Sequence, residues 1–235
     1  MAPSLISYPR DFVRQRWRLT LFLVFVLPSL CLALGTDELL ALFVFGGLTL
    51  SWISVPTARR VGYRGEIAAV RKISGVLPDG YALFNQVAVP NSWSRTGATE
   101  IDAIVVGPTG VTVIEIKSNI GTVIAGGARD QSWPVQKIGR RGTVYYTQMR
   151  NPVRQVTGQA RALRQYLGTR DISVWVNTLV VAGSRKTHWR AEHIRHVPIV
   201  PLQTRQIETA LLGTNVRTLD EAVITRAVEA IMRLK

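Results

Sequence analysis

The first 56 residues consist of a basic segment followed by two long stretches without any charge. Residues 19–35 and 39–55 are two apolar runs of 17 residues each, and only Thr36, Asp37 and Glu38 separate them. A helix of about 17–25 apolar residues is long enough to span a bilayer. The short separation leaves room only for a turn, so the pattern predicts a transmembrane helical hairpin.

The charges that flank these runs predict the orientation of the hairpin. Four arginines precede the first run and three follow the second, whereas the turn carries only acids. Because cytoplasmic flanks are enriched in Lys and Arg, we expect both termini in the cytoplasm. The expected organisation is a basic N-terminal segment (residues 1–18), the hairpin (19–56) in the inner cell membrane, and a cytoplasmic domain (57–235).

Two other interpretations of the apolar runs stay open at this point. The basic segment before the first run and the small residues around Ala33 are also typical of a cleaved signal peptide. In that case the second run still spans the membrane, and the residues after it stay cytoplasmic. The other interpretation is a pair of buried helices in a soluble core, but neither run has the polar face that such a helix normally shows to water.

Beyond residue 57 the spacing of apolar residues switches between that of helices and that of strands. Asn151 followed by Pro152 is typical of a helix start, and Thr218 with Glu221 three residues later matches a capping box. Helices are expected at residues 63–76, 151–167, 204–212 and 218–234. Strands are expected at residues 81–89, 101–106, 111–117, 173–182 and 197–202. This order predicts an α/β (α+β) fold with a mixed central sheet flanked by helices, and it leaves the basic, Gly-rich residues 121–142 without an assigned element.

Charge divides the chain at the same place as hydropathy. The net charge is +14, and the first 56 residues carry only +1 of it, which leaves +13 for residues 57–235. A domain this basic favours a polyanionic partner, either nucleic acid or anionic lipid headgroups. Ordinary solvated arginines are the alternative explanation. The single cysteine, Cys31, excludes an intramolecular disulfide framework and a zinc site built from several cysteines.

The most informative motif is a predicted hairpin with a four-residue turn. If Val106 pairs with Val111, then Asp102 lies opposite Glu115, with Cβ atoms about 4.5–5.5 Å apart. Lys117 follows Glu115 by two residues, so its side chain points to the same face. One face of the hairpin is therefore expected to present two carboxylates and an ammonium group, and a slip of one residue would separate them.

Asp102 and Glu115 both lie among Val and Ile, in strands that are expected to be buried on both faces. Two adjacent carboxylates in such surroundings repel each other and are costly to desolvate, and a divalent cation compensates for both effects. Hard oxygen ligands suit Mg²⁺ or Mn²⁺. Lys117 is suited to position or deprotonate a water, or to neutralise a phosphate oxygen. The alternative is a structural surface salt bridge of Lys117 with Glu115 or Glu100.

Several ordered motifs extend this pattern over about residues 62–170. They are Gly65-Glu66, Leu83-Phe84-Asn85-x-Val87, the stretch from Thr99 to Gly110, Val113-Ile114-Glu115-Ile116-Lys117-Ser118 and Asn151-Pro152-x-x-Gln155. Together they resemble the NERD (nuclease-related) domain, a branch of the PD-(D/E)xK restriction-endonuclease-like superfamily. The resemblance implies a restriction-endonuclease-like core. Ile101 departs from the superfamily pattern, which has a proline before the Asp.

The resemblance also implies roles for individual side chains. Asp102 and Glu115 match the metal-binding acids, and Lys117 matches the active-site lysine. Glu66 matches an acid on the first helix that can complete the metal site. Gln155 matches a polar residue that orients the substrate or a catalytic group. The implied cofactor is Mg²⁺ or Mn²⁺.

A second basic segment, residues 184–196, places charge around an aromatic side chain. Arg185, Lys186 and Arg190 flank Trp189, a combination that suits contact with a nucleic-acid backbone and stacking on bases. A solvated loop is the alternative interpretation.

The sequence thus predicts a membrane-tethered, metal-dependent nuclease that hydrolyses phosphodiester bonds of DNA or RNA. Two alternatives from other classes remain. One is a catalytically inactive, membrane-anchored module that binds nucleic acid. The other is a lipid-interacting membrane protein whose basic residues contact headgroups.

Overall fold

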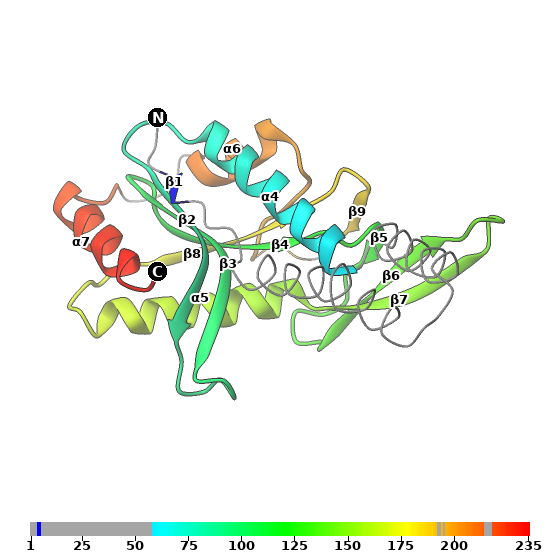
Figure 1. Ribbon diagram of the computed structural model, residues 1–235, viewed down its shortest axis with the longest axis horizontal. Helices are drawn as coiled ribbons and strands as arrows, with labels where there is room; N and C mark the ends of the chain where they lie inside the picture. The colour runs from blue at the N-terminus through cyan, green and yellow to red at the C-terminus, as the bar shows by residue number, and fades with distance from the viewer. Residues whose placement is uncertain (1–3, 6–57, 192–193, 195, 214–217) are drawn as a thin grey trace, which may run out of the picture. The chain divides into compact units, whose positions relative to one another are not determined.

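The computed structural model describes residues 4–5, 58–191, 194, 196–213 and 218–235 (Figure 1). The two runs predicted to span the membrane, residues 19–35 and 39–55, lie outside these described residues. Among the helices that are described, none is both long and apolar enough to cross a bilayer. Residues 4–5 and, within the described ranges, residues 61–235 belong to one compact unit.

A six-stranded mixed sheet forms the centre of this unit. Its strands, in spatial order, are β1 (Ser4–Leu5), β2 (Ala82–Pro90), β3 (Ala98–Gly107), β4 (Gly110–Lys117), β8 (Val176–Ala182) and β10 (Ile199–Val200). The neighbours β2, β3 and β4 are antiparallel, whereas β8 is parallel to β4. Most residues of β4 and β8 are buried, which matches their continuous apolar sequence, because central strands covered on both faces lose the alternation with polar residues.

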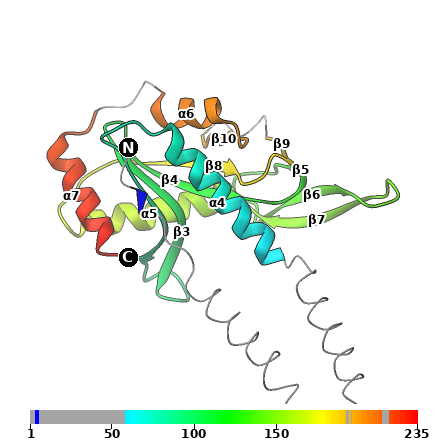
Figure 2. The same ribbon diagram turned by 45° about the horizontal axis from the view of Figure 1, so that its top comes forward.

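Helices cover both faces of the sheet, so the unit has three layers (Figures 1 and 2). The helices are α4 (Ala58–Val76), α5 (Pro152–Gly168), α6 (Thr204–Leu212) and α7 (Glu221–Met232). The helices α5 and α7 share a core with sheet residues such as Ile104 and Val106. The helices α4 and α6 pack against the alternate residues, such as Ala103 and Val105. The mixed α/β fold with flanking helices that the sequence predicted is thereby confirmed.

Residues 121–142, for which the sequence predicted no element, contribute to a second sheet. Its four strands, in spatial order, are β7 (Val144–Arg150), β6 (Ser132–Ile138), β5 (Gly121–Ile124) and β9 (Thr187–Arg190). Part of the strand signal was present, because Trp133 and Val135 are fully buried and alternate with more exposed residues. The glycines and basic residues around them are typical of loops, which explains why these strands were missed.

Two element boundaries near the C-terminus differ from the prediction. The capping box at Thr218 and Glu221 is wrong, because α7 begins at Glu221 itself and its N-cap is Asp220, whose side chain forms no capping hydrogen bond. The strand expected at residues 197–202 is reduced to Ile199–Val200. A proline flanks this pair on each side and cannot donate a backbone hydrogen bond to a sheet.

The helix α5 begins as the sequence predicted. The side-chain oxygen of Asn151 accepts hydrogen bonds from the backbone N–H groups of Val153 and Arg154, and Pro152 occupies the first helical position. The side-chain amide of Asn151 also donates to three backbone carbonyls ahead of β6, among them that of Asp130 at 2.9 Å. These bonds fix the first turn of α5 against the second sheet.

Candidate active site

The β3–β4 hairpin has the predicted register, with Val106 paired to Val111. Continuing that register brings Asp102 level with Glu115. The regular pairing stops one residue short of these acids, and Oδ2 of Asp102 instead accepts a hydrogen bond from the backbone N–H of Ile116 at 2.7 Å. The carboxylate of Asp102 therefore accepts a hydrogen bond that a backbone carbonyl would accept in regular strand pairing, at the point where the two strands separate.

In the neighbouring strand β2, the alternation of side chains between the two faces of the sheet is interrupted opposite Asp102. Phe84 faces the core beneath α5, but so does Val87, so the two-residue alternation of a strand shifts by one at Gln86. Gln86 has a φ of 52°, a left-handed conformation that costs a non-glycine residue about 1–3 kcal/mol. The pairs on either side of Gln86 place it opposite Asp102. Strained backbone therefore lies directly beside a candidate catalytic acid.

Glu115 and Lys117 lie on the side of β4 that faces α5. Oε1 of Glu115 is 2.5 Å from Nζ of Lys117, and Nζ also donates a hydrogen bond to Oε1 of Gln155 at 2.7 Å. The side chains of Glu115 and Lys117 are only 4% and 15% exposed. The salt bridge that the sequence left open as an alternative is thus present, but it lies inside the site and not on the surface.

Gln159, which the sequence analysis missed, forms a hydrogen bond with the second carboxylate oxygen of Glu115. Nε2 of Gln159 donates to Oε2 of Glu115 at 2.7 Å and to the backbone carbonyl of Glu100 at 3.1 Å. Oε1 of Gln159 is buried and has no hydrogen-bond partner among the described residues. The available signal was the four-residue spacing from Gln155, which places both glutamines on one face of a helix.

Glu66 approaches the site from α4. This helix lies so close to the ends of β4 and β8 that a Cβ on Gly65 would overlap Oγ of Ser118 and lie 2.8 Å from the carbonyl oxygen of Gly183. A glycine is therefore required for this approach. Oε1 of Glu66 accepts a hydrogen bond from Nε2 of Gln86 at 3.1 Å, so the strained residue of β2 links α4 to the acids.

Burial and mutual repulsion change the acidity of two of these carboxylates. Desolvation, and after it the charge of Glu115, raises the pKa of Asp102 to about 8, although the hydrogen bond from Ile116 opposes the shift. Burial also raises the pKa of Glu66, and the charges of Glu100 and Glu115 add to that effect. Excess negative charge in a shielded site is the condition that a bound cation relieves.

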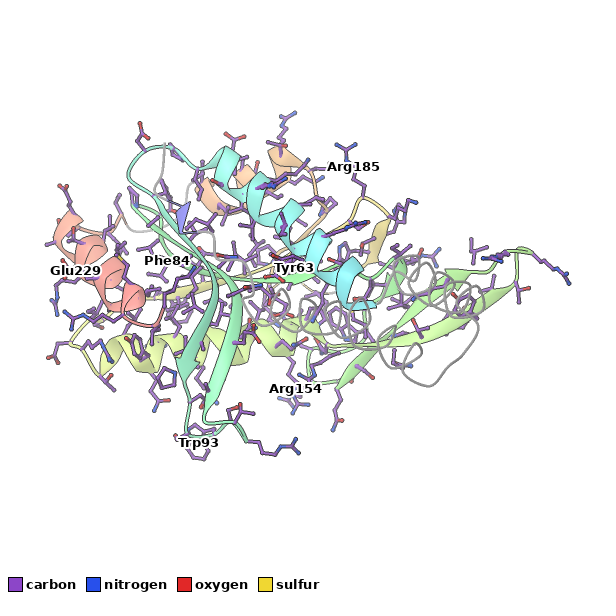
Figure 3. All side chains as sticks on the ribbon, in the orientation of Figure 1. Tyr63, Phe84, Trp93, Arg154, Arg185 and Glu229 are labelled. Atoms are coloured by element: carbon purple, nitrogen blue, oxygen red, sulfur yellow. The ribbon has the colours of Figure 1, made fainter. Side chains whose placement is uncertain are left out.

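Asp102 and Glu115 line a cleft of about 860 Å³, and so do Arg150 and Arg154. Both arginines are exposed, and neither forms an ion pair within the described part of the chain. Figure 3 shows Arg154 projecting from the start of α5 and Trp93 from the loop between β2 and β3, on the same side of the sheet. The cleft thus combines acids at its floor with cations at its rim.

The cleft offers oxygen atoms of the kind that bind a hard divalent cation. The largely buried carboxylates of Asp102 and Glu115, and Oε1 of Gln159, which has no partner among the described residues, are ligands of the type that Mg²⁺ and Mn²⁺ prefer. In the described ranges, no group of three or more His, Cys, Asp and Glu residues is arranged to hold a metal ion. Metal binding by Asp102, Glu115 and Glu66 therefore stays a prediction.

The four residues predicted to contact nucleic acid lie outside the cleft. Arg185, Lys186 and Arg190 are exposed in and before β9, and none of them lines the cleft. Trp189 is half-buried, packs against both cores, and has a buried ring nitrogen. The structure brings the acids, the lysine and both glutamines together and leaves this basic segment apart from them. Its contact with nucleic acid stays a prediction.

The mixed α/β core carries two acids and a lysine on one hairpin, an arrangement compatible with a nuclease-related domain. Comparison with known families agrees: residues 61–183, more than half of the chain, match the nuclease-related domain NERD, and the chain belongs to this family. No match was found among curated proteins or among solved structures. Family membership indicates a nuclease-related function and an interaction with nucleic acid.

Proposed function

We propose that the protein is a membrane-tethered, metal-dependent nuclease that hydrolyses phosphodiester bonds in DNA or RNA. The observation that carries this proposal is the proximity of the Asp102 and Glu115 carboxylates in a cleft that Arg150 and Arg154 also line. Paired carboxylates suit a divalent cation, and free arginines suit the phosphates on either side of the bond to be cut. The cleft thus offers a partner for each charged part of the substrate.

Asp102 and Glu115 would hold Mg²⁺ or Mn²⁺ in this proposal. A bound ion of this kind neutralises charge on a phosphate and lowers the pKa of water. The raised pKa of Asp102, about 8, means that this carboxyl must lose a proton before it can serve as a ligand. Gln159, which donates to Oε2 of Glu115, orients the second carboxylate.

Lys117 would act on the phosphate or on the attacking water. Its ammonium group is held between Glu115 and Gln155, so it is fixed in position before a substrate arrives. Fixed charges of this kind stabilise charge that develops in a transition state. Gln155 acts on Lys117 in this arrangement and is a positioning residue.

The test is a cleavage assay on the full-length protein in detergent, with end-labelled DNA and RNA and with Mg²⁺, Mn²⁺ or EDTA. We expect cleavage that requires the ion and that falls by about 100-fold or more in Asp102→Asn and in Glu115→Gln. Glu221→Gln changes an exposed acid on α7 and should cleave like the wild type. Ion-dependent cleavage that persists undiminished in both site variants contradicts the assignment.

The membrane tether is supported by the sequence, through the two uncharged runs and their arginine-rich flanks. We expect the wild-type protein to remain with membranes during alkaline extraction. An arginine near the centre of each run, in the variant Phe25→Arg/Phe45→Arg, should release it, because a charge at the bilayer centre is costly. Wild-type protein recovered in the soluble fraction argues against the tether.

Two observations favour a second function, which is nucleic-acid binding without turnover. Lys117 is occupied by Glu115 and Gln155, and the described residues hold no cluster of three acidic, His or Cys ligands. Binding that weakens with salt, together with intact DNA and RNA at every ion tested, identifies this function.

A further inference from the structure

The loop between β2 and β3 presents Trp93 at the cleft. Trp93 is 87% exposed and lines the cleft together with Asn91 and Ser94. A tryptophan side chain typically buries about 150–250 Å² when it packs. Nearly all of that aromatic surface is exposed here, beside the cleft that we propose binds nucleic acid.

Hydrogen bonds hold this loop in one conformation. Oδ1 of Asn91 accepts the backbone N–H of Trp93 at 3.0 Å, and Nδ2 of Asn91 donates to Oγ1 of Thr99 at 2.8 Å. The backbone N–H of Asn91 also donates to the carbonyl of Gly97 at 2.8 Å. The indole is therefore carried on an ordered support, so that docking a partner against it requires little additional ordering.

The cleft has cations as well as this aromatic group. Arg150 ends β7, Arg154 lies in the first turn of α5, and both line the cleft with Trp93. In Figure 3 the labelled Trp93 and Arg154 extend from different elements toward the same side of the sheet. The volume of about 860 Å³ is within the range of about 300–1,000 Å³ of small-molecule sites. Such a volume suits a few nucleotides better than a turn of duplex.

We propose that Trp93 stacks on an unpaired base while Arg150 and Arg154 bind the phosphates of the same strand. The preferred substrate is then single-stranded nucleic acid, or a duplex with unpaired bases at the cleft. This inference rests on the proposed function, because it concerns the same cleft. In a continuous duplex each base is covered by its neighbours, whereas an unpaired base has a free face on which an aromatic side chain stacks. The polar and charged lining of the cleft fits a lipid chain poorly.

The test uses the full-length protein in detergent with EDTA, so that binding is measured without cleavage, and an oligonucleotide that carries the fluorescent base 2-aminopurine. We expect the wild type to quench 2-aminopurine in the single strand and to bind that strand more tightly than the matched duplex. Trp93→Ala should weaken single-strand binding by about tenfold or more and remove the quenching. Trp93→Phe should retain most of both effects.

Trp175→Ala is the matched control. Trp175 is 68% exposed, but it lies beside Arg164 in a different pocket, so its loss should change neither affinity nor quenching. Because Trp93 is so exposed, Trp93→Ala should unfold at the wild-type temperature.

Three results overturn the inference alone: unchanged binding and quenching in Trp93→Ala, equal wild-type affinity for strand and duplex, or a Trp93→Ala defect confined to binding of anionic vesicles. A wild type that binds no oligonucleotide at low salt overturns the proposed function as well.

Discussion

Asp102 and Ile116 are joined across the β3–β4 hairpin by a hydrogen bond of 2.7 Å from the backbone N–H to Oδ2. The carboxylate of Asp102 therefore both stabilises the hairpin and belongs to the candidate active site. Asp102→Asn keeps an oxygen for this bond and loses the charge, whereas Asp102→Ala loses both. We expect Asp102→Ala to be less stable than Asp102→Asn by about 1–3 kcal/mol, measured by urea unfolding, although neither variant cleaves. Equal stability of the two variants would show that the bond does not support the hairpin.

The raised pKa of Asp102 makes the stability of the ion-free protein depend on pH. The pKa is about 8 in the folded protein and about 3.9 in an unfolded chain, so the folded state binds this proton more tightly. The resulting stabilisation is fully present below about pH 4 and is lost as the pH rises through about 8. In EDTA, the wild type should therefore lose stability relative to Asp102→Asn over this window. Urea titrations at several pH values that give a constant difference would rule out the raised pKa.

The close approach of α4 to the ends of β4 and β8 predicts opposite effects for two glycines of the same helix. Gly65→Ala places a Cβ against Ser118 and the carbonyl of Gly183, and it should destabilise the fold by about 1–3 kcal/mol and reduce cleavage. Gly75→Ala meets no atom within 4 Å and should stabilise the fold by about 0.4–1 kcal/mol. Thermal unfolding of both variants is the measurement. A Gly65→Ala protein as stable as Gly75→Ala would contradict the packing described.

Gln159 offers a test of how Glu115 is positioned. Gln159→Leu removes the donor to Oε2 of Glu115 and to the carbonyl of Glu100, and leaving these groups unpaired should cost about 1–3 kcal/mol of stability. Cleavage should fall as well, because the carboxylate loses its orientation. Gln165→Leu changes an exposed glutamine of the same helix and serves as the control. If the two variants behave alike in urea unfolding and in cleavage, Gln159 has no such role.

The salt dependence of binding distinguishes the two basic regions. A lysine or arginine that contacts a phosphate of a single strand contributes about 0.7 to the slope of log affinity against log salt concentration. Arg150→Gln/Arg154→Gln should therefore lower the slope by about 1.4. The variant Arg185→Gln/Lys186→Gln tests the nucleic-acid contact that the sequence predicted outside the cleft. A reduced slope in this variant would show that the bound strand also contacts these two residues. An unchanged slope in the Arg150/Arg154 variant would remove these arginines from the binding site.

The core of the site could be predicted from the sequence because it depends on local rules. A short turn and strict alternation fix the pairing of Val106 with Val111, and that register brings Asp102 level with Glu115. The start of α5 followed from Asn151 for a similar reason, since a cap acts within a few residues. Both features need no knowledge of the rest of the fold.

Contacts between distant segments could not be predicted in this way. Gln159 reaches Glu115 only because α5 packs on the sheet, and the two residues are 44 positions apart in the chain. The shift at Gln86 depends on a left-handed backbone that glutamine rarely adopts. In the second sheet, the pairing of β5 with β9 joins strands that lie far apart in the sequence, whereas β5, β6 and β7 were missed because their glycines and basic residues are typical of loops.

The shift at Gln86 divides the β2–β3 ribbon into two parts that can vary independently. The inner part belongs to the sheet and carries Asp102, while the outer part ends in the loop that carries Trp93. Because the alternation restarts at the shift, a new loop sequence does not turn the inner side chains toward a different face. If Trp93 stacks as proposed, exchanging residues 91–97 is expected to change the nucleic-acid preference while Asp102 keeps its place in β3.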